Sequence, residues 1–150
     1  MQYLTVQDMI WINTQVTGAP QPYYYATLEE ATFYQYGYGK STDLFAQAAR
    51  FFQGFKRLHP FKAGNEATAL VGLIAFLELN GQNFLGDVST VRDWLEGKHA
   101  EGVGLVEALK LATRPAENHD ESVSAQQACS GALARLTAAV GDLRADYAQH

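Results

Sequence analysis

Residues 59–81 read HPFKAGNEATALVGLIAFLELNG, and this stretch decides how the rest of the chain is interpreted. It begins with a His-Pro pair, passes through a short loop to Gly64, and continues as an apolar run that closes on an Asn-Gly pair. A residue that precedes proline is disfavoured in helical conformation, so one helix should end at Leu58. A second helix should begin at Asn65. The stretch therefore predicts two apolar helices joined by a loop that starts with a titratable side chain.

The loop has the composition of an anion site beside a proton acceptor. A helix N-terminus presents unpaired backbone N–H groups and the positive end of the helix dipole. Gly64 removes the side chain that would block close approach, and Asn65 is suited to cap the helix or to face an anion. His59 lies six residues before Asn65, close enough to take a proton from an attacking hydroxyl. The structural alternatives are a histidine that caps the preceding helix and an ordinary loop with an N-cap.

These residues resemble the signature of the Fic/Doc (Fido) superfamily, and specifically its death-on-curing (Doc) branch. The family pattern is close to HPFxDGNKRTAL followed by an apolar helix that ends in FLELNG. The resemblance covers about residues 3–100 and includes Tyr3-Leu4-Thr5-Val6 and Leu28-Glu29-Glu30-Ala31. It implies an all-α Fic/Doc helical bundle with a short flap hairpin or loop and an additional C-terminal helix. It also implies transfer of a phosphoryl or AMP group from ATP, with Mg²⁺, to a protein hydroxyl.

The resemblance also implies a role for individual residues. His59 would be the general base and Phe61 the core anchor. The phosphates or nucleotide would be bound by Gly64, Asn65, Glu66 and Thr68. The aromatic loop 34–41 would match the flap that aligns a target chain by strand-like pairing, through Tyr36, Tyr38, Gly39 and Lys40. A toxin of this branch would have a small antitoxin as partner and a protein target such as a translation factor.

Three positions depart from the family pattern. Ala63 stands where the family has an acidic residue that holds Mg²⁺, and it offers no side-chain oxygen. Glu66 and Ala67 stand where the family has Lys and Arg on the phosphates. One charge pair at about 4 Å is worth roughly 4 kcal/mol gross at an effective dielectric near 20, and each 1.4 kcal/mol or so of barrier changes a rate about tenfold. The sequence therefore predicts that transferase activity is impaired.

Three functions are open at this point. The first is a Doc-like transferase of toxin–antitoxin type with a degenerate site. The alternative is a catalytically inactive protein-binding module that keeps the Fic fold and uses its Tyr-rich flap or its C-terminal helix. The third is a working enzyme whose missing cations are replaced by Lys62, Arg57 or Lys40 and whose metal is carried by Glu66.

Outside the central stretch the apolar periodicity is also helical. Helices are expected over 6–16, 27–33, 42–58, 65–79, 87–100, 103–112 and 122–148. The last has apolar residues spaced by three and four, a seam that would pack on its own domain, on a partner or in a homodimer. The polar segment 113–121 predicts a flexible joint. The chain would thus divide into a Doc-like domain over 1–114 and a linker with C-terminal helix over 115–150.

Composition limits the partners and the compartment. The chain has 150 residues and a net charge of -5, which excludes binding to nucleic acid or an anionic membrane through bulk charge. The single Cys129 permits no internal disulfide, and its spacing from His99, His119 and His150 fits no metal site. The apolar stretch 67–79 is too short to span a bilayer, and no secretory signal is apparent at the start. We therefore expect a cytoplasmic protein.

Overall fold

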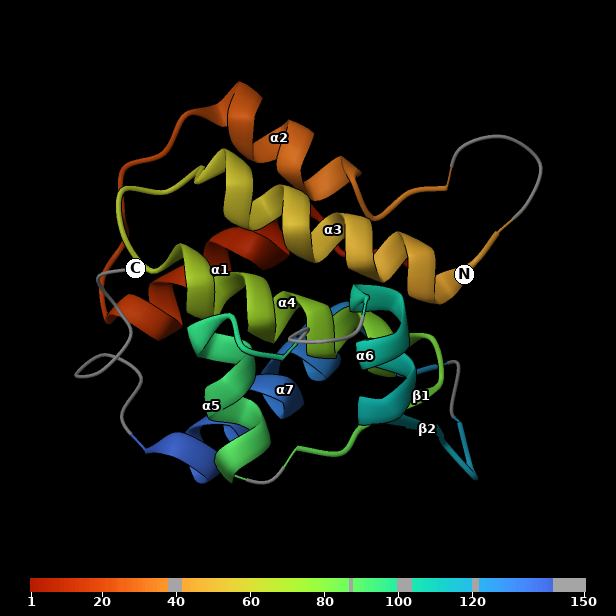
Figure 1. The fold of residues 1–150 in the computed structure, drawn as a ribbon. Coiled ribbons are helices and arrows are strands. Elements are labelled where there is room, and N and C mark those ends of the chain that lie inside the picture. Colours follow the sequence, from red (N-terminus) through yellow and green to blue (C-terminus); the bar gives the residue numbers. More distant parts are fainter. Residues whose placement is uncertain (38–41, 87, 100–103, 120–121, 142–150) are drawn as a thin grey trace.

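The structure is a computed structural model that describes residues 1–37, 42–86, 88–99, 104–119 and 122–141 (Figure 1). Its helices are α1 (Val6–Thr17), α2 (Tyr25–Phe33), α3 (Leu44–Leu58), α4 (Asn65–Leu79), α5 (Val88–Glu96), α6 (Leu105–Ala112) and α7 (Ala125–Val140). Two short strands, β1 (Gln82–Phe84) and β2 (Thr113–Pro115), pair antiparallel with Asn83 opposite Arg114. The expected all-α fold class is confirmed.

Helix α4 is the centre of the bundle. Its sequence is apolar on every side, so it is buried on every side, with α1, α3 and α7 packed around it (Figure 1). Gly72 lets α1 approach closely, because a Cβ at this position would lie 2.8 Å from the Cε of Met9. The loop before α4 therefore joins two helices, α3 and α4, that pack in the same core.

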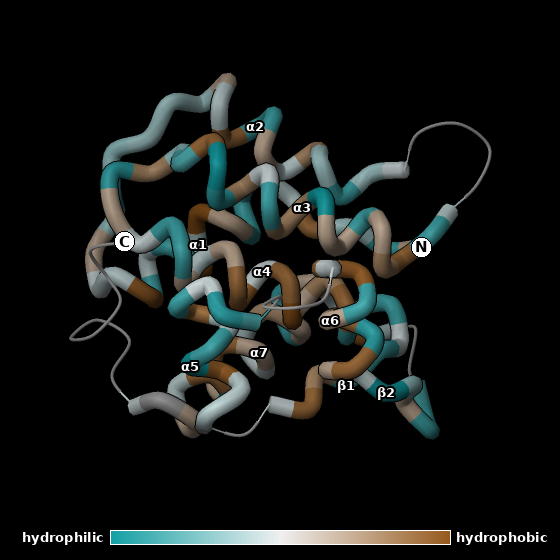
Figure 2. The backbone as a smooth tube through the Cα atoms, viewed as in Figure 1, coloured by the Kyte–Doolittle hydropathy of each residue, from teal (hydrophilic) through white to brown (hydrophobic). Residues whose placement is uncertain are grey.

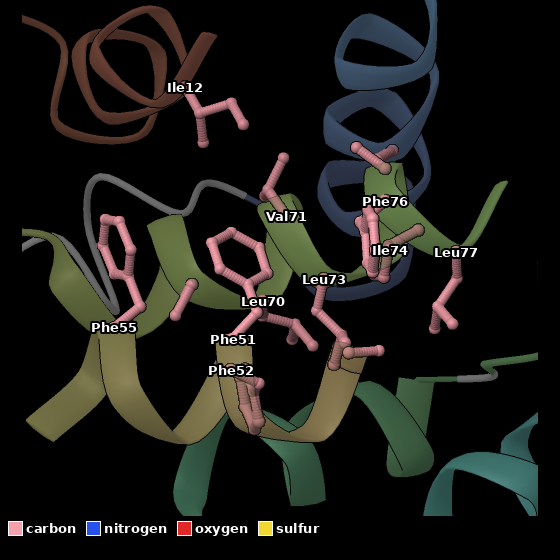
Figure 3. Close-up of a cluster of buried hydrophobic side chains, with 14 of the residues drawn as sticks. Ile12, Phe51, Phe52, Phe55, Leu70, Val71, Leu73, Ile74, Phe76 and Leu77 are labelled. Carbon is pink, nitrogen blue, oxygen red and sulfur yellow. The ribbon is translucent and has the colours of Figure 1, made fainter. Parts of the chain in front are cut away.

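Aromatic side chains of α3 fill the space between α3 and α4. Phe51, Phe52 and Phe55 are essentially inaccessible to solvent (Figure 3). The Phe51 ring packs edge-on against Phe76 of α4 at 6.1 Å between ring centroids, and the Phe52 ring packs on Trp94 of α5 at 5.6 Å. Burial of each such ring contributes about 1.5–3 kcal/mol. Hydrophilic segments lie on the outside of the bundle, as at β2 (Figure 2). The C-terminal end of α3, which carries the His-Pro pair, is thereby anchored to the core.

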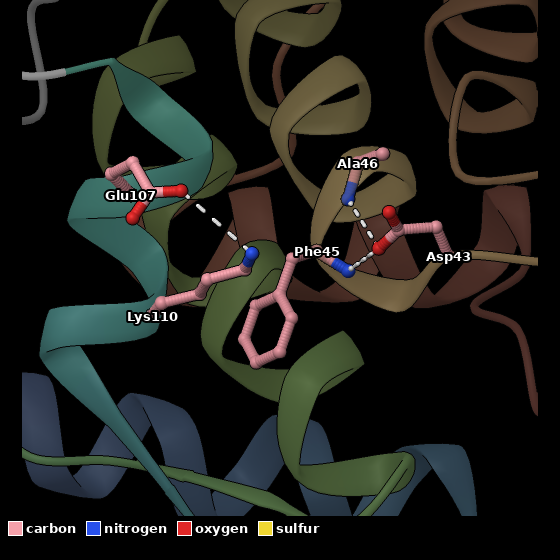
Figure 4. A network of polar contacts seen from close by, with 5 residues as sticks. All are labelled: Asp43, Phe45, Ala46, Glu107 and Lys110. Atoms are coloured by element: carbon pink, nitrogen blue, oxygen red, sulfur yellow. Dashed lines mark hydrogen bonds and ion pairs between the residues drawn. The ribbon is translucent and has the colours of Figure 1, made fainter.

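The observed helix ends differ from the predicted ones for local reasons. The predicted helix 65–79 matches α4, and a capping box formed by Thr5 and Asp8 starts α1. Helix α3 begins after Asp43, whose carboxylate accepts hydrogen bonds from the N–H groups of Phe45 and Ala46 at 3.1 and 3.2 Å (Figure 4). Helix α7 ends at Val140, where Gly141 takes a φ of 80°, and residues 142–148 of the predicted helix lie outside the described residues.

The C-terminal third of the described chain packs on the same core. Cys129, Ala132 and Leu136 of α7 are buried, and α7 contacts α4. Arg135 of α7 forms an ion pair with Glu78 of α4 and donates a hydrogen bond to the carbonyl of Phe84 at 3.2 Å. In the described part of the chain, the buried side chains of α7 therefore pack on the core of the same domain.

The predicted flexible joint over 113–121 is wrong at its start. Residues 113–115 form β2, because the backbone of this segment pairs with β1 directly after α4. A three-residue strand has too little pattern of its own to be recognised without its partner. Across the described part of the chain, no helix is both long and apolar enough to cross a bilayer.

Candidate functional site

His59 occupies the left-handed turn that ends α3. Its φ and ψ are 52° and 56°, and its backbone N–H donates to the carbonyl of Phe55 at 3.2 Å. Among the described residues it is the single non-glycine residue with positive φ. This conformation costs an L-residue about 1–2 kcal/mol, and glycine is the usual choice for it. The turn terminates the helix and leaves the imidazole exposed, so His59 both caps α3 and faces solvent.

Phe61 fixes the middle of the loop. Its ring is buried with 2% exposure and packs edge-on against Tyr23, at 5.6 Å between ring centroids, and against Phe55 at 6.3 Å. The backbone of Phe61 forms an antiparallel bridge with Tyr23, and the neighbouring N–H of Lys62 donates to the carbonyl of Pro22 at 2.9 Å. The loop after α3 is thus joined to the segment between α1 and α2.

Asn65 holds the loop rather than capping the helix. Its Oδ1 accepts a hydrogen bond from the N–H of Phe61 at 3.0 Å, and its Nδ2 donates to the carbonyl of Phe61 at 2.7 Å. The expectation that Asn65 is the N-cap is wrong, because Gly64 enters the helix with a φ of 79° and takes that position. The Asn65 side chain then turns back into the loop, where it is fully buried.

Thr68 is turned into the core, toward a residue that sequence reasoning missed. Asn13 of α1 is fully buried, and its Nδ2 donates to Thr68 Oγ1 at 3.1 Å and to the carbonyl of Ala63 at 2.9 Å. Its Oδ1 is buried without a hydrogen-bond partner. The available signal was an asparagine between Ile12 and Val16 on the apolar face of α1. Asn13 therefore links α1 to both ends of the segment that the family pattern assigns to phosphate.

Glu66 forms an ion pair with a lysine of α3. Its carboxylate lies 3.4 Å from Nζ of Lys56, and the same ammonium group sits 4.6 Å from the centre of the Phe52 ring. Ala67 is fully buried, and Ala63 has a single oxygen, its carbonyl, which accepts from Asn13. The part of the chain that the structure describes has no group of three or more His, Cys, Asp or Glu side chains placed to hold a metal ion.

A pocket of about 390 Å³ lies beside His59. It is lined by Pro22, Tyr23, Tyr24, His59, Pro60, Phe61 and Lys62. The residues that begin α4 are not among these lining residues, and Asn65, Ala67 and Thr68 are fully buried. The open space next to the histidine therefore belongs to the aromatic segment before α2 and not to the N-terminus of α4.

The segment predicted as a flap is only partly described. Tyr38, Gly39 and Lys40 lie outside the described residues. The ring of Tyr36 contacts the ring of Tyr3 in a tilted arrangement, at 4.2 Å between ring centroids, and the Tyr36 carbonyl accepts a hydrogen bond from Arg50. Arg50 precedes His59 by nine residues, about 13 Å along the helix axis at about 1.5 Å per residue. The structure thus places residues 22–24 beside His59 and places Tyr36 nearer to the middle of α3.

The helical bundle and its His-Pro-Phe loop, which leads into a buried central helix, define a Fic-type fold. The sequence model of a protein family described as the Fic/DOC family matches residues 3–77, half of the chain. The chain therefore belongs to the Fic/DOC family. The match covers α1 to α4 except the last two residues of α4, and it includes the loop from His59 to Gly64. No curated protein and no solved structure matches the chain significantly.

Proposed function

We propose that this Fic/DOC protein is impaired or inactive as a transferase and acts by binding a protein segment in the pocket beside His59. The observation that carries the proposal is the lining of that pocket. It combines two exposed tyrosines and the exposed Pro22 with His59, whereas the residues that would hold phosphate are buried or paired. Such a surface favours a polypeptide over a triphosphate.

The first turn of α4 supports the loss of nucleotide transfer. In the family pattern, residues 66 and 67 would carry two cations for the phosphates. Here the Glu66 carboxylate is committed to Lys56, and Ala67 has no exposed surface. A triphosphate near this turn would meet a carboxylate instead of a cation, and the amide of Asn65 is already used by Phe61. The helix dipole alone contributes about 0.3–1 kcal/mol in exposed settings, too little to hold ATP.

Calorimetry with ATP and Mg²⁺ tests this part of the proposal. We expect no heat of binding in a sample whose circular dichroism shows folded helix. A triple variant exchanges the charges of the ion pair, with Lys56→Glu and Glu66→Lys, and adds Ala63→Asp. It restores a cation at residue 66 and a metal ligand at residue 63 while it keeps the ion pair. Binding by the unmodified protein that disappears in His59→Ala would instead show a nucleotide site beside His59 and contradict this part of the proposal.

The binding role is tested by site-specific photo-crosslinking in the native host. A photoreactive amino acid at Tyr24, which is 81% exposed, should give a discrete protein adduct. The same amino acid at Leu111, which is 71% exposed and outside this pocket, is the matched control. Equal crosslinking at both positions would contradict a binding site at the pocket. A small antitoxin or the protein target of a Doc-type toxin is the expected identity of the adduct.

A further inference from the structure

Several backbone groups of the segments that line the pocket beside His59 are already hydrogen-bonded, and two N–H groups are absent. Pro22 and Pro60 directly precede the bridged residues Tyr23 and Phe61, and a proline has no N–H to donate. The N–H and carbonyl of Phe61 are bonded to Asn65, and the N–H of Lys62 is bonded to Pro22. An added strand needs a row of free backbone groups at an edge. This edge therefore does not suit a target bound by strand addition.

The side chains of the pocket suit a different extended conformation. Tyr23 and Tyr24 are 41% and 81% exposed, and with the two prolines they form an aromatic and apolar lining. Grooves lined by aromatic rings recognise polyproline II segments, which have no internal hydrogen bonds and lose little entropy on binding. Tyrosine adds a hydroxyl that can donate to the exposed carbonyls of such a segment.

The charge of the pocket points to the sequence of that segment. Lys62 and His59 are both exposed there, and none of the described residues that line the pocket carries a carboxylate. The chain as a whole has a net charge of -5, so a cationic pocket is a local exception. A bound segment would be steered by complementary charge.

We propose that the pocket binds an extended segment that contains prolines and a nearby Asp or Glu, through side-chain contacts and without strand pairing. This inference rests on the proposed function and names the chemistry of its partner. The prolines lie against the rings of Tyr23 and Tyr24 beside Pro22, and the carboxylate lies toward Lys62. The partner segment holds a polyproline II conformation before it binds.

Fluorescence anisotropy with labelled synthetic peptides tests the proposal on the full chain. A peptide of repeated Pro-Pro-Glu triplets should bind saturably, and a peptide of Pro-Pro-Lys triplets should bind more weakly. Tyr24→Ala should weaken binding about tenfold, as for an aromatic residue at the centre of an interface. Tyr25→Ala is the matched control, because Tyr25 is 57% exposed and does not line the pocket.

Reversal of the Lys62 charge provides a second test in the same peptide-binding assay. Lys62→Glu should exchange the preference, so that the Pro-Pro-Lys peptide binds better than the Pro-Pro-Glu peptide. Lys110→Glu, on the exposed surface of α6, should leave the preference unchanged. Both variants alter exposed side chains, so the fold is not at risk.

Three outcomes would overturn the inference. Preference for a strand-forming peptide of Thr-Val-Glu triplets would show that the pocket uses strand addition after all. Absence of binding to every peptide, together with a specific crosslink at Tyr24, would reject the proline-containing acidic segment and leave the proposed protein-binding role standing. Absence of both the crosslink and the peptide binding would reject the proposed function itself.

Discussion

Replacement of Asn65 by alanine tests whether the site loop is held by a single side chain. The Asn65 carboxamide makes two hydrogen bonds to the backbone of Phe61, at 3.0 and 2.7 Å, in a fully buried position. In Asn65→Ala the N–H and the carbonyl of Phe61 both lose their partner, and each unpaired buried group costs about 1–3 kcal/mol. The better helix propensity of alanine returns at most about 0.7 kcal/mol. The expected loss in free energy of unfolding is therefore about 3 kcal/mol.

Urea unfolding followed by circular dichroism measures this loss. With a urea slope of about 2 kcal/mol per molar, the unfolding midpoint should fall by about 1.5 M. Asn118→Ala is the matched control, because Asn118 lies in an exposed turn. Amide hydrogen exchange adds a local readout, since the N–H of Phe61 should be protected in the unmodified protein and exchange faster in Asn65→Ala. An Asn65→Ala midpoint equal to that of Asn118→Ala, with the Phe61 amide still protected, would refute the reasoning.

Three further predictions concern backbone strain and buried titratable groups. His59→Gly should raise the free energy of unfolding by about 1 kcal/mol relative to His59→Ala in urea titrations, because glycine adopts the φ of 52° without strain. Burial raises the pKa of the Cys129 thiol to about 12, so the folded protein should resist thiol reagents that label it in urea, and stability should fall above pH 9.0 as the unfolded thiol ionises. Burial and the charge of Lys56 lower the pKa of His99 below 6.5, so the unfolded state takes up the proton first and stability should fall as the pH drops through 6.5. His99→Gln should flatten that dependence of the urea midpoint on pH.

The helices could be predicted from sequence because their signals are local. Helix α4 follows from a loop with Gly64 and an apolar run, and both of its ends match the prediction. The strand pair was missed because residues 82–84 and 113–115 define each other only across the fold. The end of the C-terminal helix at Val140 coincides with Gly141, whose positive φ is visible only in the structure.

The candidate site could be located from sequence but not assembled. The position of His59 follows from the His-Pro pair, whereas its left-handed turn is visible only in the structure. Asn65 was correctly placed at the start of α4, but the direction of its side chain depends on the turn at Gly64. The contact of Tyr23 with Phe61 joins residues that are far apart in the chain, so no local pattern could identify the segment beside the histidine.

The ion pair between Lys56 and Glu66 constrains which substitutions are tolerated at the first turn of α4. A single change of Glu66 to lysine would set two ammonium groups about as close as the present 3.4 Å contact, with both side chains only partly exposed. Glu66→Lys alone would therefore destabilise the bundle while it adds a cation to this turn. Lys56 has to change first or at the same time, so the effect of a substitution at Glu66 depends on the residue at position 56. This dependence favours keeping Glu66.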